Sequence, residues 1–180
     1  MAKIDSPLRY AAPMRWMHWC VFAFVVAAYL FVNLFELFPR GSEARANTLA
    51  FHYLAGLAVL LLVLPRFWLR SRHVIPAIVP PLDSWMNSLG KTTHFVLYAF
   101  LLLQPVLGVI TLQAGGKPVS LFGLTLFPVF VSVPDRDLSH QLENIHGTIG
   151  TIFYWVIGLH ILAALWHHFI KRDNTLRRMI

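Results

Sequence analysis

The chain has 180 residues, of which 57% are hydrophobic and only 13% are charged, and its formal net charge is +7. Soluble domains carry about twice that share of charged residues, so the composition argues for a membrane protein. The positive charge does not indicate nucleic-acid binding, because the basic residues gather on one side of the predicted membrane spans, where they also attract anionic lipid.

Four uncharged, mostly apolar runs follow one another along the chain. About twenty such residues cross the hydrocarbon layer as a helix, so we expect four transmembrane helices. The first run is too long for the apolar part of a signal peptide, and no small-residue cleavage site follows it, so we expect it to be retained. The predicted fold class is all-α, an integral membrane four-helix bundle forming a single domain over 1–180. The predicted spans cover about 15–36, 46–66, 91–114 and 143–170.

The positive-inside rule orients these spans. With a cytoplasmic N-terminus, eleven of the fifteen basic residues lie in cytoplasmic segments, so we expect both termini to be cytoplasmic. The cytoplasmic set is Lys3, Arg9, Arg15, Arg66, Arg70, Arg72, Lys91, Lys171, Arg172, Arg177 and Arg178, and the outer set is Arg40, Arg45, Lys117 and Arg136.

The segments between the spans carry different signals. Prolines at 76, 80 and 81 predict an extended connector over 66–91, and Pro105 predicts a kink within the third span. The segment 115–143 is long and apolar, and a loop of that length without structure of its own is unusual. We expect a short interfacial helix or lid there, over the outer end of the bundle.

Four histidines lie within the predicted spans: His18, His52, His146 and His160. Ionisable side chains are costly in a bilayer, so such histidines indicate a functional site. His146 and His160 are fourteen residues apart, which places them on nearly the same helix face at roughly 21 Å separation. Alternating the spans across the membrane pairs His18 with His160 on the cytoplasmic side and His52 with His146 on the outer side.

Two histidines per site favour haem over zinc, because structural zinc takes four clustered ligands whereas haem iron accepts axial histidines. The alternatives are a cation site without haem, or histidines that serve only as helix-packing partners. Covalent attachment is excluded, since Cys20 is the one cysteine and no C-x-x-C-H motif is present. We therefore expect two b haems.

Residues near these histidines fit the same interpretation. Gly56 and Gly150 each follow a histidine by four residues, and a glycine lets a flat macrocycle approach the helix backbone, although small residues also serve helix packing. Arg15 and Arg66 lie at the cytoplasmic end, where they are candidates to pair with haem propionates or simply to flank their spans. His94 and His167 lie at that end too, as candidates for a quinone headgroup pocket or as interface residues.

The order and spacing of these residues resemble the bacterial cytochrome b561 family over nearly the whole chain. The residues that carry the resemblance are the Arg15–Trp19 start, His52 with Gly56, Arg66, His94, Pro105 and Gly108, Phe122–Thr125, His146, Gly158–His160, His167–His168, Lys171 and Asp173–Leu176.

The resemblance implies haem ligation by the four histidines in the pairs given above, a superoxide oxidase activity that passes electrons to ubiquinone, and a place in the bacterial inner membrane. The quinone site is implied around His94 and His167. Family members can carry lysines in the proline-rich connector, and here Lys91 is the nearby candidate. Superoxide is an anion, and Arg40, Arg45 or Lys117 would attract it locally.

The sequence thus predicts a dihaem membrane cytochrome that acts as a superoxide:ubiquinone oxidoreductase. A second hypothesis is a membrane anchor and electron conduit between a periplasmic redox partner and the quinone pool, docking near Asp135 and Asp137. The third is a haem-free cation carrier.

Overall fold

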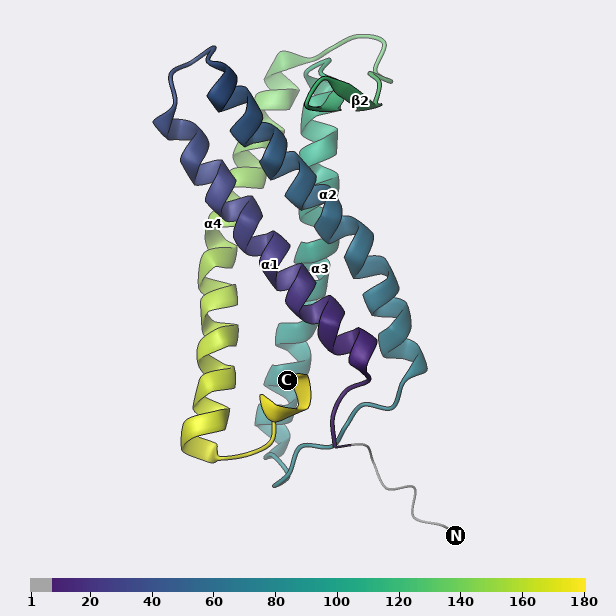
Figure 1. The fold of residues 1–180 in the computed structure, drawn as a ribbon, viewed down its shortest axis with the longest axis vertical. Coiled ribbons are helices and arrows are strands. Elements are labelled where there is room, and N and C mark those ends of the chain that lie inside the picture. The colour runs from purple at the N-terminus through teal and green to yellow at the C-terminus, as the bar shows by residue number, and fades with distance from the viewer. Residues whose placement is uncertain (1–7) are drawn as a thin grey trace.

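A computed structural model of the protein describes residues 8–180, so the predicted cytoplasmic Lys3 lies outside the described residues. Four long helices dominate it, which confirms the all-α fold class (Figure 1). All four are long and apolar enough to cross a membrane. The helices are α1 (Ala12–Leu34), α2 (Glu43–Arg72), α3 (Ser84–Ala114) and α4 (Arg136–Trp166). Short elements are η1 (Phe35–Leu37), β1 (Val119–Leu121), β2 (Leu124–Phe127), η2 (His167–Lys171) and η3 (Arg177–Met179).

Each predicted span lies within one observed helix or its continuation, but three helices extend well beyond the prediction. α2 continues through Pro65 to Arg72, α3 begins at Ser84, and α4 begins at Arg136. The reason is that uncharged runs mark only the part in hydrocarbon, whereas the helices project past it with their charged residues. The extended connector is correspondingly limited to 73–83. α3 passes through Pro105 without ending, and the kink there stays a prediction.

Local sequence explains where several helices begin. Pro13 stands in the first turn of α1, where its missing N–H costs nothing. The side chain of Ser42 accepts a hydrogen bond from the Arg45 N–H at the start of α2, and that of Asp135 accepts one from the Leu138 N–H at the start of α4. These caps satisfy backbone donors that a helix start leaves free.

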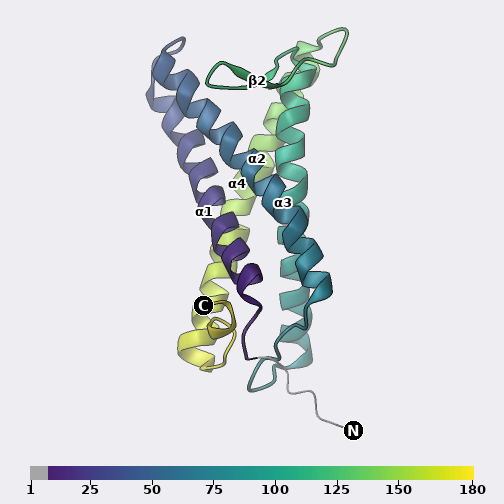
Figure 2. The same cartoon turned by 45° about the vertical axis from the view of Figure 1, so that its right-hand side comes forward.

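The helices pack as two pairs, α1 with α2 and α3 with α4, joined by contact between α2 and α3. Figure 2 shows the two pairs separating toward one end of the bundle, where the β1–β2 hairpin lies across them. We call this the hairpin end. The opposite end, which we call the terminal end, holds the start of α1, the connector 73–83 and the C-terminal segment 172–180 (Figure 1).

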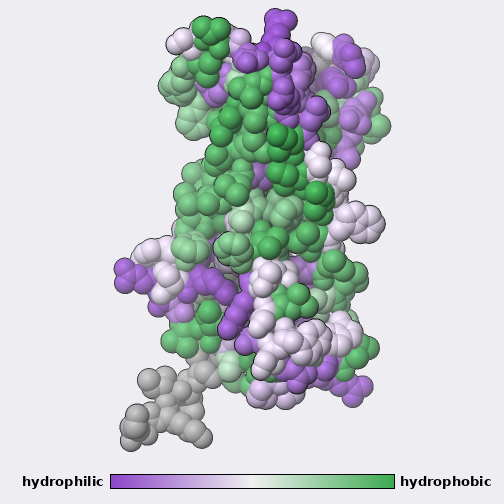
Figure 3. Space-filling model, turned by 180° about the vertical axis from the view of Figure 1, so that it is seen from behind, coloured by the Kyte–Doolittle hydropathy of each residue, from purple (hydrophilic) through white to green (hydrophobic). Residues whose placement is uncertain are grey.

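The surface has the character of a membrane protein. An apolar band crosses the middle of the face seen in Figure 3, and hydrophilic residues gather toward both ends. Large apolar side chains stand exposed along the helices, for example Leu61 at 72% and Trp155 at 76%. In water this would be very costly, whereas lipid covers it at no cost.

The segment 115–135 differs in part from the prediction. It contains no helix; β1 and β2 form an antiparallel hairpin in which Leu121 pairs with Leu124. Gly123 turns the chain at φ 85°, a conformation that favours glycine. The expected lid is nevertheless present, since the hairpin covers the bundle end and its Val119 is 1% exposed. Val119, Thr125 and Phe127 are β-branched or aromatic residues, which favour strands.

Candidate functional site

Two of the four predicted histidines meet near the hairpin end. His52 on α2 and His146 on α4 face each other with ring centroids 6.2 Å apart and ring planes at 85°. The two residues are far apart in the sequence and come from different helix pairs. The structure thus brings together the outer pair that the sequence predicted.

Both rings line a cavity of about 340 Å³ that takes its walls from all four helices and from β1. The volume falls in the range of about 300–1,000 Å³ that small-molecule and cofactor sites occupy. The wall is mostly apolar, with polar groups from Tyr29, Asn33 and Gln104 among others. Gly56 and Gly150, which the sequence placed on the histidine faces, both line it. A Cβ atom added at Gly56 would meet nothing within 4 Å, so a macrocycle has room to approach that backbone.

The orientation of His52 suits metal binding. Its Nδ1 lies 2.9 Å from the carbonyl oxygen of Ala28. A carbonyl only accepts, so Nδ1 carries the hydrogen and Nε2 keeps the lone pair that a metal needs. A hydrogen bond of this kind is the usual way in which proteins fix a ligating histidine.

His146 is held through neighbours on α3. The amide of Gln104 donates to the His146 carbonyl oxygen at 2.6 Å, and a Cβ atom added at Gly108 would lie 3.3 Å from the His146 Cε1. His146 Nδ1 and Gln104 Oε1 are both buried without a partner. Such buried polar atoms call for a partner, and they lie at the cavity that a cofactor would fill.

The other two predicted histidines lie in a cluster toward the terminal end. His160 on α4 has the ring of His94 on α3 as its close neighbour, with centroids 5.7 Å apart. His18 on α1 interacts electrostatically with Arg66, His160 and His94, which places it in the same cluster. The sequence predicted His18 as the partner of His160 and made His94 a candidate for a quinone pocket near that pair. The structure adds His94 to the predicted pair.

This cluster also contains a buried cation, Arg66. Its guanidinium donates to the Met14 carbonyl oxygen at 3.0 Å and lies 3.2 Å from His18 Nδ1. The residue is only 9% exposed, and none of its described hydrogen bonds goes to a carboxylate. Buried charges in proteins are normally paired, so an anionic group is the expected partner of Arg66. Tyr98, whose ring lies 5.8 Å beneath the guanidinium, also has a buried hydroxyl without a partner.

The remaining predicted site residues have neighbours of other kinds. Arg15 donates to the Ile180 carbonyl oxygen in the C-terminal segment. Lys91 is exposed on α3. His167 lies 2.5 Å from the carboxylate of Asp173, and His94 donates from Nδ1 to the Gly90 carbonyl oxygen of its own helix. Of the two candidate quinone residues, His167 is thus paired with a carboxylate and His94 with a backbone carbonyl oxygen.

The pair at the hairpin end fits a haem held by two histidines. With metal–nitrogen bonds of about 2 Å on each side, two axial imidazole rings have their centroids about 6 Å apart. Within residues 8–180, no three His, Cys, Asp or Glu side chains converge to hold a metal ion, which is the arrangement that zinc prefers. The geometry of His52 and His146 therefore suits a metal held between two histidines.

Comparison with known proteins agrees with this geometry. The family model described as prokaryotic cytochrome b561 matches residues 9–180. The chain belongs to the prokaryotic cytochrome b561 family. It is similar to cytochrome b561 homolog 1 of Escherichia coli (strain K12), with 35% identity covering 96% of this chain and 97% of that protein. It is 31% identical to the probable superoxide oxidase CybB of Yersinia pestis, over 96% of each chain. Cytochrome b561 homolog 2 of Escherichia coli (strain K12) is 25% identical, over 100% of this chain and 95% of that protein.

As a cytochrome b561, the protein is a multi-pass bacterial membrane protein for electron transfer with b-type haem. Its site contains residues that the sequence reasoning missed. Gln104 carried a usable signal, because it is a polar residue in the middle of an apolar span, where side chains need a hydrogen-bond partner. The second residue is Tyr29, whose hydroxyl donates to the Gly150 carbonyl oxygen at 2.8 Å. The sequence carries no signal for it, because a tyrosine in a span also suits packing.

Proposed function

We propose that this cytochrome b561 binds two b haems and passes single electrons from superoxide on one side of the membrane to ubiquinone at the other. The observation that carries the proposal is the facing of His52 and His146 across a cavity bounded by all four helices. Haem iron supplies the one-electron chemistry when bound, and the protein contributes axial ligands, a low-dielectric surrounding and access routes.

The proposed first haem site is the hairpin-end cavity, where His52 and His146 would hold the iron and Gly56 would give space for the macrocycle, with Gly150 in the same wall. The hydrogen bond from His52 Nδ1 to the Ala28 carbonyl oxygen leaves Nε2 free to bind the iron.

The proposed second haem site uses His18 and His160, with Arg66 and Arg15 receiving carboxylates of the cofactor. The unpaired charge of buried Arg66 supports this assignment, because a propionate would supply the missing anion. His94 is the competing ligand, since its ring is close to that of His160 and its Nδ1–H bond leaves Nε2 free.

The orientation we propose places both termini in the cytoplasm and the hairpin end on the periplasmic side of the inner membrane. The distribution of basic residues supports it, because eleven of fifteen then face the cytoplasm. Superoxide would arrive at the hairpin end. Arg45 is held there by the carbonyl oxygens of Phe35 and Phe38 and keeps its charge, so it would attract the anion together with Arg40 and Lys117.

The proposed reaction oxidises two superoxide ions to two dioxygen molecules and reduces one ubiquinone to ubiquinol with uptake of two protons. The name of the Yersinia pestis relative supports this choice of substrate. We place the quinone at the terminal end near His94, His167 and Lys91, because the ammonium of exposed Lys91 and the Nε2 of a protonated His167 would donate to its carbonyl oxygens. Its protons would come from the cytoplasm.

Reduced-minus-oxidised spectra with a haem count per chain test the cofactor assignment. We expect two low-spin b haems in the purified protein. His52→Ala and His146→Ala should each lose the same haem, and His18→Ala and His160→Ala the other. His94→Ala decides the second site: if it removes a haem while His18→Ala does not, the pairing of His18 with His160 is wrong.

Superoxide chemistry has its own test. Superoxide generated beside the oxidised, membrane-reconstituted protein should reduce the haem at a near-diffusional rate, and added ubiquinone should reoxidise it. Superoxide dismutase in the assay is the control that removes the reductant. Slow or absent reduction would contradict superoxide as the substrate while leaving electron transfer intact.

A specific feature favours a second candidate, an electron conduit for a periplasmic redox protein. All four residues of β2 are exposed, among them Leu124 at 66% and Phe127 at 44%, and acidic Asp135 and Asp137 stand nearby in the sequence. Stable co-purification of a soluble redox protein, lost on Leu124→Asp, would favour this function over superoxide oxidation.

A further inference from the structure

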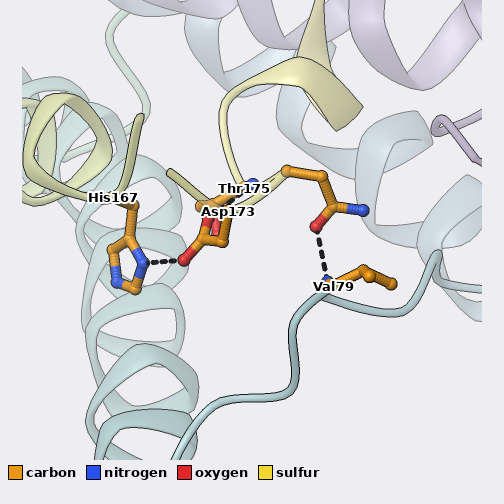
Figure 4. A network of polar contacts seen from close by, with 5 residues as sticks. Val79, His167, Asp173 and Thr175 are labelled. Carbon is orange, nitrogen blue, oxygen red and sulfur yellow. Dashed lines mark hydrogen bonds and ion pairs between the residues drawn. The ribbon is translucent and has the colours of Figure 1, made fainter. Parts of the chain in front are cut away.

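We propose that Asp173 positions His167 to deliver protons to the quinone, an inference that rests on the proposed quinone site. The two side chains form a carboxylate–imidazole pair where α4 ends, in which the carboxylate is buried and the imidazole is partly buried (Figure 4). Asp173 is a positioning residue in this arrangement, because it acts on the substrate only through His167.

Both carboxylate oxygens of Asp173 accept hydrogen bonds. Its Oδ2 lies 2.5 Å from His167 Nδ1, and its Oδ1 accepts from the Thr175 N–H at 2.8 Å. The side chain of Asp173 is 1% exposed and that of His167 is 15% exposed. The carboxylate is thus withdrawn from water, while the imidazole keeps an accessible edge.

The chain places Asp173 there by an abrupt change of direction. The five residues of η2 form a π-helical turn, a feature frequent at functional sites, and Arg172 follows in the left-handed region at φ 55°. The chain then turns back, so Asp173 approaches His167 from outside the helix. An uninterrupted α-helix would carry residue 173 away from residue 167.

The rest of the C-terminal segment anchors this position to other parts of the bundle. Asn174 and Val79 form a reciprocal pair. The Val79 N–H donates to the Asn174 side chain at 2.8 Å, which is the dashed line at Val79 in Figure 4, and the Asn174 N–H donates to the Val79 carbonyl oxygen at 3.1 Å. Trp19 Nε1 donates to the Met179 carbonyl oxygen at 2.9 Å. α1, the connector and α4 are therefore tied together beside the His167–Asp173 pair.

Electrostatics keep Asp173 in its ionised form. Burial raises the pKa of Asp173, but hydrogen bonds from His167 and Thr175 outweigh burial and hold that pKa below its usual range. Arg178 adds a cation whose charge interacts with Asp173. The other titratable groups on this turn are His168, Lys171 and Arg172, and the ammonium of Lys171 lies over the Trp166 ring at 5.3 Å.

An ionised carboxylate only accepts hydrogen bonds, so His167 Nδ1 carries a hydrogen in both protonation states of the ring. Proton exchange is thereby confined to Nε2. A proton leaves Nε2 for a quinone oxygen as that oxygen gains electron density, and the ring recovers a proton from cytoplasmic water. Two such transfers, matched by two electrons from two superoxide ions, convert one quinone to quinol.

The competing explanation is that Asp173 only fastens the C-terminal segment. Both explanations predict a less stable protein when the carboxylate is removed. They differ in the pH dependence of quinone reduction, because only proton delivery links Asp173 to the protonated form of the imidazole, which a carboxylate stabilises and an amide does not.

The experiment uses the haem-loaded, full-length protein and a short-chain ubiquinone analogue. Haem is first reduced by superoxide, and its reoxidation by the quinone is followed across pH. In Asp173→Asn we expect the pH dependence of the reoxidation rate to change and the maximal rate to drop about tenfold. Asp83→Asn is the matched control, since Asp83 is a carboxylate at the same end that makes no side-chain capping bond.

Haem reduction by superoxide is the internal control and should be unchanged in Asp173→Asn, because it takes place at the opposite end. If wild-type haem is not reoxidised by the quinone, the proposed function fails and this inference fails with it. If the wild type reacts but Asp173→Asn keeps its pH profile, only the role of Asp173 is overturned.

His167→Gln tests the pair from the other side and retains an amide donor for the carboxylate. We expect the pH dependence to disappear in this variant, and Asp173→Asn to add nothing further to it. An unchanged pH profile in His167→Gln overturns the proposal even if Asp173→Asn fails to bind haem.

Discussion

At the residue scale, the facing of His52 and His146 depends on a small neighbour. Gly108 lies against the imidazole of His146, where an added Cβ would stand 3.3 Å from Cε1. The absence of a side chain at Gly108 therefore allows the His146 ring to lie close to α3.

Replacing Gly108 with leucine should displace His146 and remove one haem of two. The added side chain exceeds the available space, and overpacking of this kind costs about 1–3 kcal/mol even where no ligand is lost. Haem per chain and the reduced spectrum measure the effect. Gly158→Ala, on α4 with nothing within 4 Å of the added Cβ, is the control and should keep both haems.

Arg66 offers a second test at this scale. If its charge faces a haem at the terminal end, Arg66→Gln should lower the midpoint potential of that haem by about 60 mV, equivalent to about 1.4 kcal/mol for one electron. A cation favours the reduced, less positive iron. Arg70→Gln is the matched control, since Arg66 and Arg70 both lie over the Tyr98 ring but only Arg66 bonds to His18. A redox titration in which both haems keep wild-type potentials in Arg66→Gln would contradict the assignment.

At the element scale, the hairpin separates the cavity from the surroundings of the bundle. Val119 in β1 is buried and lines the cavity, whereas every residue of β2 is exposed. The two strands of one hairpin therefore face different surroundings.

A charge on each strand should accordingly have different effects. Val119→Asp places a carboxylate in the apolar wall, which costs several kcal/mol or forces its protonation, so we expect loss of the hairpin-end haem. Leu124→Asp should retain both haems and the superoxide reaction. Spectra of the two variants, purified side by side, provide the comparison, and equal haem retention would contradict the lid role of β1.

The helices themselves could be predicted well from the sequence, because uncharged length alone specifies a membrane span. The pairing of His52 with His146 also followed, since alternating spans bring both residues to similar depth. The hairpin did not follow, because an apolar loop is compatible with a helix or a strand. Nor did the proximity of His94 to His160, since depth and helix face do not determine which of three neighbouring rings lie together.

At the scale of the whole molecule, the C-terminal segment joins elements from both ends of the chain. The Tyr10 N–H donates to the Arg178 carbonyl oxygen at 3.0 Å, and Arg178 in turn donates to the Pro76 carbonyl oxygen. No pattern in the sequence indicates this arrangement, because a hydrogen bond to a backbone carbonyl oxygen does not require a particular residue type at the acceptor.

Through Asp173, the stability that the C-terminal segment contributes depends on pH. Its pKa is lower in the folded protein than the ordinary value of 3.8, so its ionised form contributes stability above that value and loses it as the pH falls through the folded pKa. We expect Asp173→Asn to melt at a lower temperature than the wild type at pH 7, with the difference shrinking below about pH 4. Thermal unfolding followed at both pH values measures this. A difference that persists unchanged in acid would show that the carboxylate charge is not its source.

The two histidines on α4 have a consequence for biogenesis. His146 and His160 lie on α4, the fourth long helix in chain order, whereas their proposed partners, His18 and His52, lie on α1 and α2. Neither proposed haem site is complete until α4 has inserted beside α1 and α2, so the proposal implies that cofactor capture follows the insertion of α4. Until then, the helices already in the membrane hold two unpaired histidines, and the insertion of α4 completes both proposed sites together.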